Sequence, residues 1–184
     1  MGGVSVSEQV ETVVLQIRER AESLYRTRQL LCTEAVLVAM NRSLGGGLTE
    51  AQAVGLASGL TVGLGESGCL CGALSGAVLA LGLLLGGAKP YKQRKEVRTA
   101  AKELHDAFTS KFKSSCCRIL TRKVKGNDKA HFDQCAQLTG EAAEMAARLV
   151  LSRRPELLAS AETEYLSRKD SPAFGLIRSL VRRL

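Results

Sequence analysis

The sequence predicts an all-α protein: a compact multi-helix bundle around a central, apolar helix rich in glycine and alanine. Three observations lead to this prediction. The chain has only three prolines in 184 residues, and Ala, Leu, Glu, Lys and Arg, which favour helices, dominate it. No stretch alternates β-branched and polar residues as a strand would. The chain length suits a single hydrophobic core.

One globular unit is expected, and along the chain it divides into an N-terminal amphipathic helix (1–30), a cysteine-containing helical domain (31–150) and a basic helical C-terminal extension (151–184). Ser5 and Glu8 form a capping-box pattern, and apolar residues follow at helical spacing, which predicts a first helix over about 7–28. A second helix, over about 31–42, places Cys32 on its core-facing side.

Residues 51–88 are the most apolar part of the chain, and Glu66 is their only charged residue. The stretch 69–88 has no charge over twenty residues, which is long enough for a transmembrane helix. One alternative is therefore a membrane-embedded helical hairpin over 51–88. Its first limb, 51–64, is short and weakly hydrophobic, so the favoured interpretation is a central helix buried by its neighbours.

A long charged helix is expected from Pro90 to about Ser114, because proline is favoured at the first helical position. Helical spacing turns five of its residues inward: Val97, Ala101, Leu104, Ala107 and Phe108.

Three further helices are expected in the C-terminal third of the chain. Asn127 or Asp128 caps the first of them, on which Cys135 points inward. A second is expected over 155–168, and Pro172 begins a short basic one.

Positive charge gathers between Lys89 and Lys125, where twelve Lys or Arg residues face three acidic ones, a net +9 in a chain of net +8. The stretch is either a solvated helix face or a docking surface for an acidic redox partner protein or an anionic substrate. Nucleic acid is not expected as a partner, because only Tyr91, Phe108 and Phe112 are present to stack on bases.

The six cysteines indicate redox chemistry or metal binding. The N-terminus lacks the basic and apolar regions of a signal peptide, so we expect a cytoplasmic protein with reduced thiols. The cysteines lie on four separate segments: Cys32, Cys69 with Cys71, Cys116 with Cys117, and Cys135. The alternative is that they only pack as small apolar residues of a structural helical interaction protein.

The stretch Cys71-Gly72-Ala73-Leu74-Ser75-Gly76 resembles the CGAxxG signature of the C_GCAxxG_C_C family of redox-active proteins. The segments around Cys32, Cys117 and Cys135 resemble the family's other cysteine segments, in the same order, over about residues 31–150. The resemblance implies a helical protein with four functional cysteines: Cys32, Cys71, Cys117 and Cys135. Cys69 and Cys116 are additional, which leaves open the functional member of each pair.

One mechanism that fits these cysteines is an iron–sulfur centre held by the four thiolates, with electron transfer as its function. Gly72, Ala73 and Gly76 would then bring bare backbone and amide N–H groups close to the cofactor. Zinc is the less favoured metal, and its case rests on His131, four residues before Cys135 on one helix face. The further candidate ligands are Cys69, Cys116 and His131.

The second mechanism is dithiol–disulfide exchange, with Cys71 and Cys117 as the candidate catalytic residues. The Lys and Arg residues around Cys117 are expected to lower the pKa of its thiol and so favour the reactive thiolate. The sequence leaves open whether the protein is an enzyme or an electron carrier.

Overall fold

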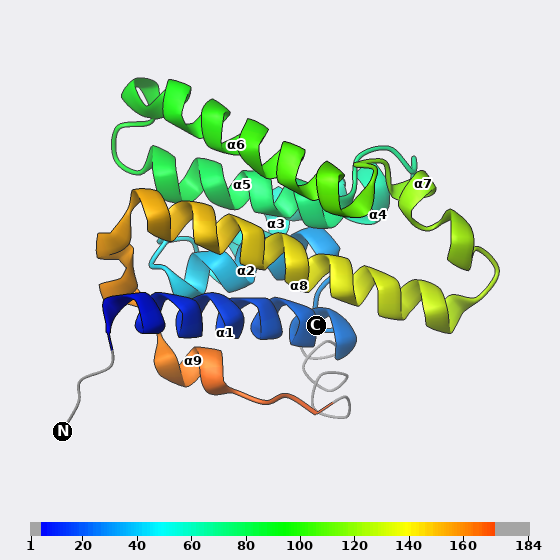
Figure 1. The fold of residues 1–184 in the computed structure, drawn as a ribbon. Helices are drawn as coiled ribbons and strands as arrows, with labels where there is room; N and C mark the ends of the chain where they lie inside the picture. Colours follow the sequence, from blue (N-terminus) through cyan, green and yellow to red (C-terminus); the bar gives the residue numbers. More distant parts are fainter. Residues whose placement is uncertain (1–4, 172–184) are drawn as a thin grey trace.

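Figure 1 shows the computed structural model, which describes residues 5–171 of the chain. These residues form helices joined by loops, and none of them lies in a β-strand, so the all-α prediction is confirmed. The long helices are α1 (Val6–Arg26), α2 (Cys32–Ser43), α5 (Gly72–Gly86), α6 (Pro90–Phe112) and α8 (Asp128–Arg153). The short elements, in which η marks a 3₁₀ helix, are α3 (Glu50–Ala57), η1 (Ser58–Leu60), α4 (Thr61–Leu64), α7 (Cys117–Leu120), η2 (Arg122–Val124), η3 (Pro155–Ser160) and α9 (Thr163–Ser167).

Helix α5 lies in the middle of the bundle, where it packs against α2, α6 and α8. None of its residues is exposed, and none is charged. Helices α1 and α8 lie side by side and run in opposite directions, with α2 packed against both (Figure 1). An apolar helix without a polar face is stable in such a position because its neighbours cover it on all sides.

Residues 51–88 do not form the helical hairpin of the alternative interpretation. The first limb is broken into α3, η1 and α4, where Val62 and Gly63 adopt left-handed backbone angles (φ 52° and 72°). The second limb is α5, which is 15 residues long. Among the helices of the described residues, none is both long enough and apolar enough to cross a membrane.

The ends of the helices follow the capping patterns of the sequence. At the start of α1, the Ser5 hydroxyl accepts a hydrogen bond from the Glu8 N–H, while the Glu8 carboxylate accepts one from the Ser5 N–H. At the start of α8, the Asn127 side chain accepts a hydrogen bond from the Ala130 N–H. Both caps satisfy N–H groups that have no partner inside the helix.

Helix α6 buries a stripe formed by Ala100, Leu104 and Phe108. The inward position predicted for Ala107 is wrong, because this residue is exposed. It directly precedes Phe108, so it lies about 100° around the helix from the buried stripe.

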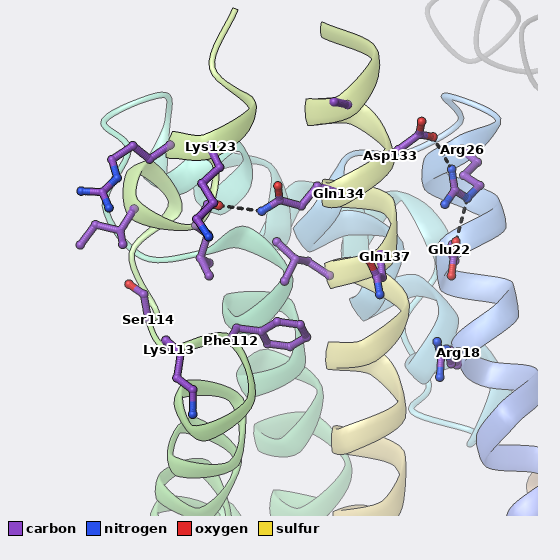
Figure 2. Close-up of a pocket in the computed structure, with 15 residues that line it drawn as sticks. Arg18, Glu22, Arg26, Phe112, Lys113, Ser114, Lys123, Asp133, Gln134 and Gln137 are labelled. Atoms are coloured by element: carbon purple, nitrogen blue, oxygen red, sulfur yellow. Dashed lines mark hydrogen bonds and ion pairs between the residues drawn. The ribbon is translucent and has the colours of Figure 1, made fainter. Parts of the chain in front are cut away.

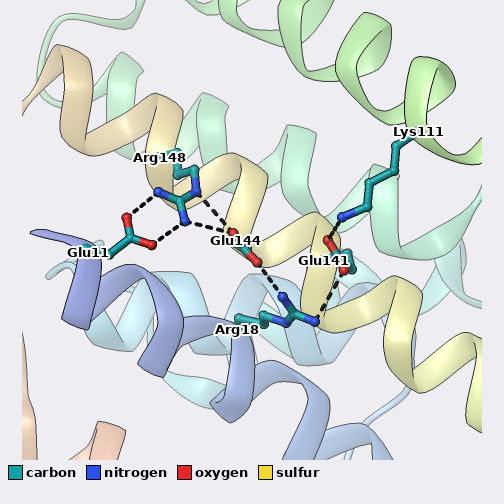
Figure 3. Close-up of polar contacts among 6 residues, drawn as sticks. All are labelled: Glu11, Arg18, Lys111, Glu141, Glu144 and Arg148. Atoms are coloured by element: carbon teal, nitrogen blue, oxygen red, sulfur yellow. Dashed lines mark hydrogen bonds and ion pairs between the residues drawn. The ribbon is translucent and has the colours of Figure 1, made fainter.

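Ion pairs join α1, α6 and α8 (Figure 3). The buried carboxylate of Glu141 on α8 contacts Arg18 on α1 and Lys111 on α6. Arg18 also pairs with Glu144, at 2.9 Å, and Arg148 extends the network back to α1. The network holds the three helices in one arrangement close to the end of α6.

The chain returns to α1 after α8. The helix predicted over 155–168 is broken into η3 and α9, and the helix expected from Pro172 lies outside the described residues. Beyond α9 the carboxylate of Asp170 pairs with the guanidinium of Arg20 at 2.8 Å, and both side chains are 1% exposed. Arg20 also stacks on the ring of Tyr165. These contacts fasten the segment after α8 to α1.

Candidate functional site

Four cysteines from four separate elements line one small cavity of about 60 Å³. They are Cys32 at the start of α2, Cys71 directly before α5, Cys117 at the start of α7 and Cys135 on α8. Most of the other lining residues are apolar, among them Leu31, Val62, Leu120 and Leu138. The site therefore combines several thiols with a mostly apolar wall and little room for water.

The glycines that follow Cys71 let α2 approach α5 very closely. A β-carbon on Gly72 would lie 2.4 Å from Cys32 Sγ, and one on Gly76 would lie 2.6 Å from the backbone oxygen of Thr33. Both distances are too short for real contacts, so only glycine fits at these positions. The two glycines thus bring the start of α2, with Cys32, against the start of α5, with Cys71.

The additional cysteines, Cys69 and Cys116, do not line this cavity. Cys69 is exposed, and Cys116 is half-buried with its Sγ donating to the backbone oxygen of Gly68 at 3.3 Å. Within each pair it is therefore Cys71 and Cys117 that face the cavity, a distinction that the sequence left open.

Two loops meet at the edge of the cavity and hold Cys71 and Cys117 in place. The Cys71 N–H donates to the Ser115 carbonyl at 2.7 Å, and the Arg118 N–H donates to the Gly68 carbonyl at 3.1 Å. Gly63 packs below them in a left-handed conformation, where a β-carbon would lie 2.7 Å from Cys117 Cβ. These contacts fix the relative position of the two cysteine pairs.

Burial raises the pKa of the thiols in the cavity. It raises the pKa of Cys71 to about 12, although the backbone N–H groups of Leu74 and Ala73 act in the opposite direction. It raises the pKa of Cys135 to about 11. A thiolate loses its hydration in such a place, so the protonated form is favoured.

The expectation of a lowered pKa for Cys117 is wrong. Burial, followed by the charges of Cys32 and Cys116, raises the pKa of this thiol instead. Among neighbouring charges, that of Cys32 contributes most to the raised pKa of Cys71, Cys117 and Cys135 alike. Cys32 thus lies close enough to each of the other three thiols to affect its pKa, because charge effects weaken with distance.

Tyr25 of α1 is a member of this site that the sequence analysis did not single out. It lines the cavity together with Cys135 and stacks on Phe132 with ring centroids 5.1 Å apart. Burial, and then the nearby charge of Cys135, raises the pKa of its phenol. The available signal was its position four residues after the buried Ala21, on the core-facing side of the helix.

Within residues 5–171, no group of three or more His, Cys, Asp or Glu side chains is positioned to hold one metal ion. His131 lines the cavity next to Cys135 but is itself exposed. The glycines proposed as cofactor contacts pack on α2.

Comparison with known proteins adds one finding. The model of a family described as "Putative redox-active protein (C_GCAxxG_C_C)" matches residues 30–149. The matched region contains all four cysteines of the cavity. No curated protein and no solved structure matches the chain.

Proposed function

The chain belongs to the C_GCAxxG_C_C family, and from this premise we propose that it carries out dithiol–disulfide exchange with the thiols of the cavity. The observation that carries the proposal is the convergence of Cys32, Cys71, Cys117 and Cys135, from four elements, on one small and mostly apolar cavity. Cysteines that served only for packing would have no reason to meet at one place.

The half-buried Cys117 is the first thiol to react. Its thiolate attacks one sulfur of a substrate disulfide, which forms a mixed disulfide and releases the other half of the substrate as a thiol. Cys32, which neighbours the other three thiols, then attacks the Cys117 sulfur and releases the second half. The substrate gains two electrons and two protons, and the protein retains a Cys32–Cys117 disulfide.

The buried Cys71 completes the reaction by an internal exchange. Its thiolate attacks Cys32 across the close contact at Gly72, which produces a Cys32–Cys71 disulfide and returns Cys117 as a thiol. The raised pKa of Cys71 favours this product, because a thiol of high pKa is a poor leaving group and remains in the disulfide. A dithiol of this kind is a reductant of other disulfides.

Disulfide mapping tests the proposal. The reduced protein is treated with one equivalent of a small disulfide, and its bonds are mapped by mass spectrometry. We expect two free thiols to disappear and Cys32 to be found in an internal disulfide. The Cys32→Ser variant should stop at a mixed disulfide on Cys117, while Cys69→Ser, which alters an exposed thiol outside the cavity, should behave like the wild type.

Two results would contradict the proposal. One is an internal disulfide that forms in the Cys32→Ser variant as fast as in the wild type. The other is iron with matching acid-labile sulfide in protein purified without oxygen, which would replace thiol exchange with an iron–sulfur centre. Zinc without iron would favour a zinc-stabilised helical protein.

A further inference from the structure

A large groove of about 1020 Å³ adjoins the cysteine cavity. Figure 2 shows residues that line this groove. It lies between α1, the end of α6, the α7–η2 region and α8. Leu120 and Leu138 line both the groove and the cavity, so these two side chains separate them. A molecule in the groove is therefore one side-chain layer away from the thiols.

The groove is positively charged. Five of its residues are basic and two are acidic: Arg18, Arg26, Lys113, Arg122 and Lys123, against Glu22 and Asp133. Arg18 and Arg26 already pair with carboxylates. Lys113 donates to a backbone oxygen, and within the described part of the chain no ion pair involves Lys113, Arg122 or Lys123. Three cations thus line the groove without a carboxylate partner among residues 5–171.

Neutral side chains complete a surface suited to a peptide. The ring of Phe112 provides an apolar wall, and the amide of Gln137 adds a hydrogen-bonding group (Figure 2). Leu138 is a further apolar residue of this wall. The Gln134 side chain donates to the Leu120 carbonyl at 2.6 Å and so fastens α7 to α8 at the boundary with the cavity.

We propose that this groove binds a carboxylate-bearing disulfide of peptide size and delivers it to Cys117. The proposal rests on the thiol exchange proposed above and names its substrate class. Lys113, Arg122 and Lys123, which form no ion pair with any described residue, match carboxylates. The groove volume is that of a site for a ligand of several residues. Leu120 lies in the same one-turn helix as Cys117, so a shift of α7 that breaks the hydrogen bond from Gln134 to Leu120 would open the cavity towards the groove.

Two disulfides, one that carries carboxylates and one that is neutral, test this inference. The reduced protein is oxidised by glutathione disulfide, which carries carboxylates, or by bis(2-hydroxyethyl) disulfide, which is neutral. The measured quantity is the second-order rate constant for glutathione disulfide divided by that for bis(2-hydroxyethyl) disulfide. We expect this ratio to fall at least about tenfold from low to high salt, because screening weakens the attraction of the groove for carboxylates.

Matched charge reversals distinguish the effect of the groove on the rate ratio from the effect of the net charge. The triple variant Lys113→Glu/Arg122→Glu/Lys123→Glu should lower the ratio about tenfold or more. The control Lys89→Glu/Lys92→Glu/Lys95→Glu changes the net charge equally, on exposed residues at the other end of α6. It should retain most of the wild-type ratio. Circular dichroism verifies that both variants are folded.

The outcomes distinguish this inference from the proposed function. Equal losses in the two triple variants, or a wild-type ratio that does not depend on salt, would overturn the groove as the binding site while thiol exchange stands. Failure of both disulfides to oxidise the cavity thiols would overturn the proposed function itself.

Discussion

Cys135 shows how burial controls the reactivity of a single thiol in this protein. Its side chain is half-buried and lines the cavity together with Tyr25. Burial, and then the charges of Cys32 and Cys117, raise its pKa to about 11. Only the thiolate is nucleophilic. At neutral pH this residue is therefore almost entirely in the unreactive thiol form.

Alkylation as a function of pH tests this shift. In the reduced protein, the rate at which iodoacetamide modifies Cys135 should rise about tenfold per pH unit from pH 7 to about 10, because the thiolate fraction rises in that proportion below the pKa. Site-resolved mass spectrometry gives the rate. Free cysteine in the same samples is the control, and its rate should level off above about pH 8.5. A plateau for Cys135 at the same pH would contradict the prediction.

The same shift has a consequence for stability. The unfolded chain loses the Cys135 proton near the ordinary pKa of 9.0, whereas the folded protein keeps it up to about 11. Between these values the unfolded state binds fewer protons, so the free energy of unfolding falls as the pH rises. Cys71, with a pKa of about 12, contributes in the same direction.

At the scale of elements, the contact between α2 and α5 determines the geometry of the site. Gly72 and Gly76 are one helical turn apart on the face of α5 that meets the start of α2. The CGAxxG pattern is therefore a packing motif here, and its effect on the thiols is indirect. It positions Cys32 by allowing two backbones to approach each other.

A glycine pair within α5 tests this role. Gly76→Ala should lower the free energy of unfolding by about 1–3 kcal/mol, because the new methyl group would lie 2.6 Å from the Thr33 carbonyl oxygen. Gly82→Ala, in the same helix, meets no atom within 4 Å and should stabilise the protein by up to about 1 kcal/mol. Urea unfolding measures both. A Gly76→Ala variant as stable as Gly82→Ala would refute the close contact.

The sequence predicted the elements whose signal is local. Helices α1, α2, α6 and α8 follow from helical spacing and caps, and each begins within two residues of its expected start. The breaks inside residues 51–64 and 155–168 were not predicted, because short helices depend on the packing around them. Only the family resemblance allowed the four cysteines of the cavity to be grouped from the sequence. Tyr25 follows the core-facing spacing of α1, and Lys113, Arg122 and Lys123 belong to the basic stretch 89–125. That these residues line one cavity and one groove depends on tertiary contacts, which no local pattern indicates.

At the scale of the whole molecule, the segment after α9 closes the bundle over α1. Asp170 pairs with Arg20 at 2.8 Å and accepts a hydrogen bond from Gln29 at 2.7 Å. Burial alone would raise the pKa of Asp170, but the hydrogen bonds from Gln29 and Arg20 hold it below the ordinary 3.8. This buried pair joins α1 to the segment after α9, through two residues that are 150 positions apart in the sequence.

Removal of the Asp170 charge should therefore destabilise the entire bundle. Asp170→Asn leaves the buried guanidinium of Arg20 without its carboxylate, and breaking such a pair costs about 3–5 kcal/mol of unfolding free energy. Urea unfolding at pH 7 measures this loss. The control is Asp106→Asn, which removes an exposed carboxylate on α6 and should leave the unfolding midpoint unchanged.

The effect of pH distinguishes an ion pair from simple packing in this segment. Because the folded protein holds the Asp170 pKa below its unfolded value, the unfolded state binds more protons as the pH falls below about 4. The stability that the pair contributes is present at neutral pH and is lost as the pH falls through the lowered pKa. The difference between wild type and Asp170→Asn should therefore shrink in acid, whereas a difference that is the same at pH 7 and pH 3 would assign the effect to packing.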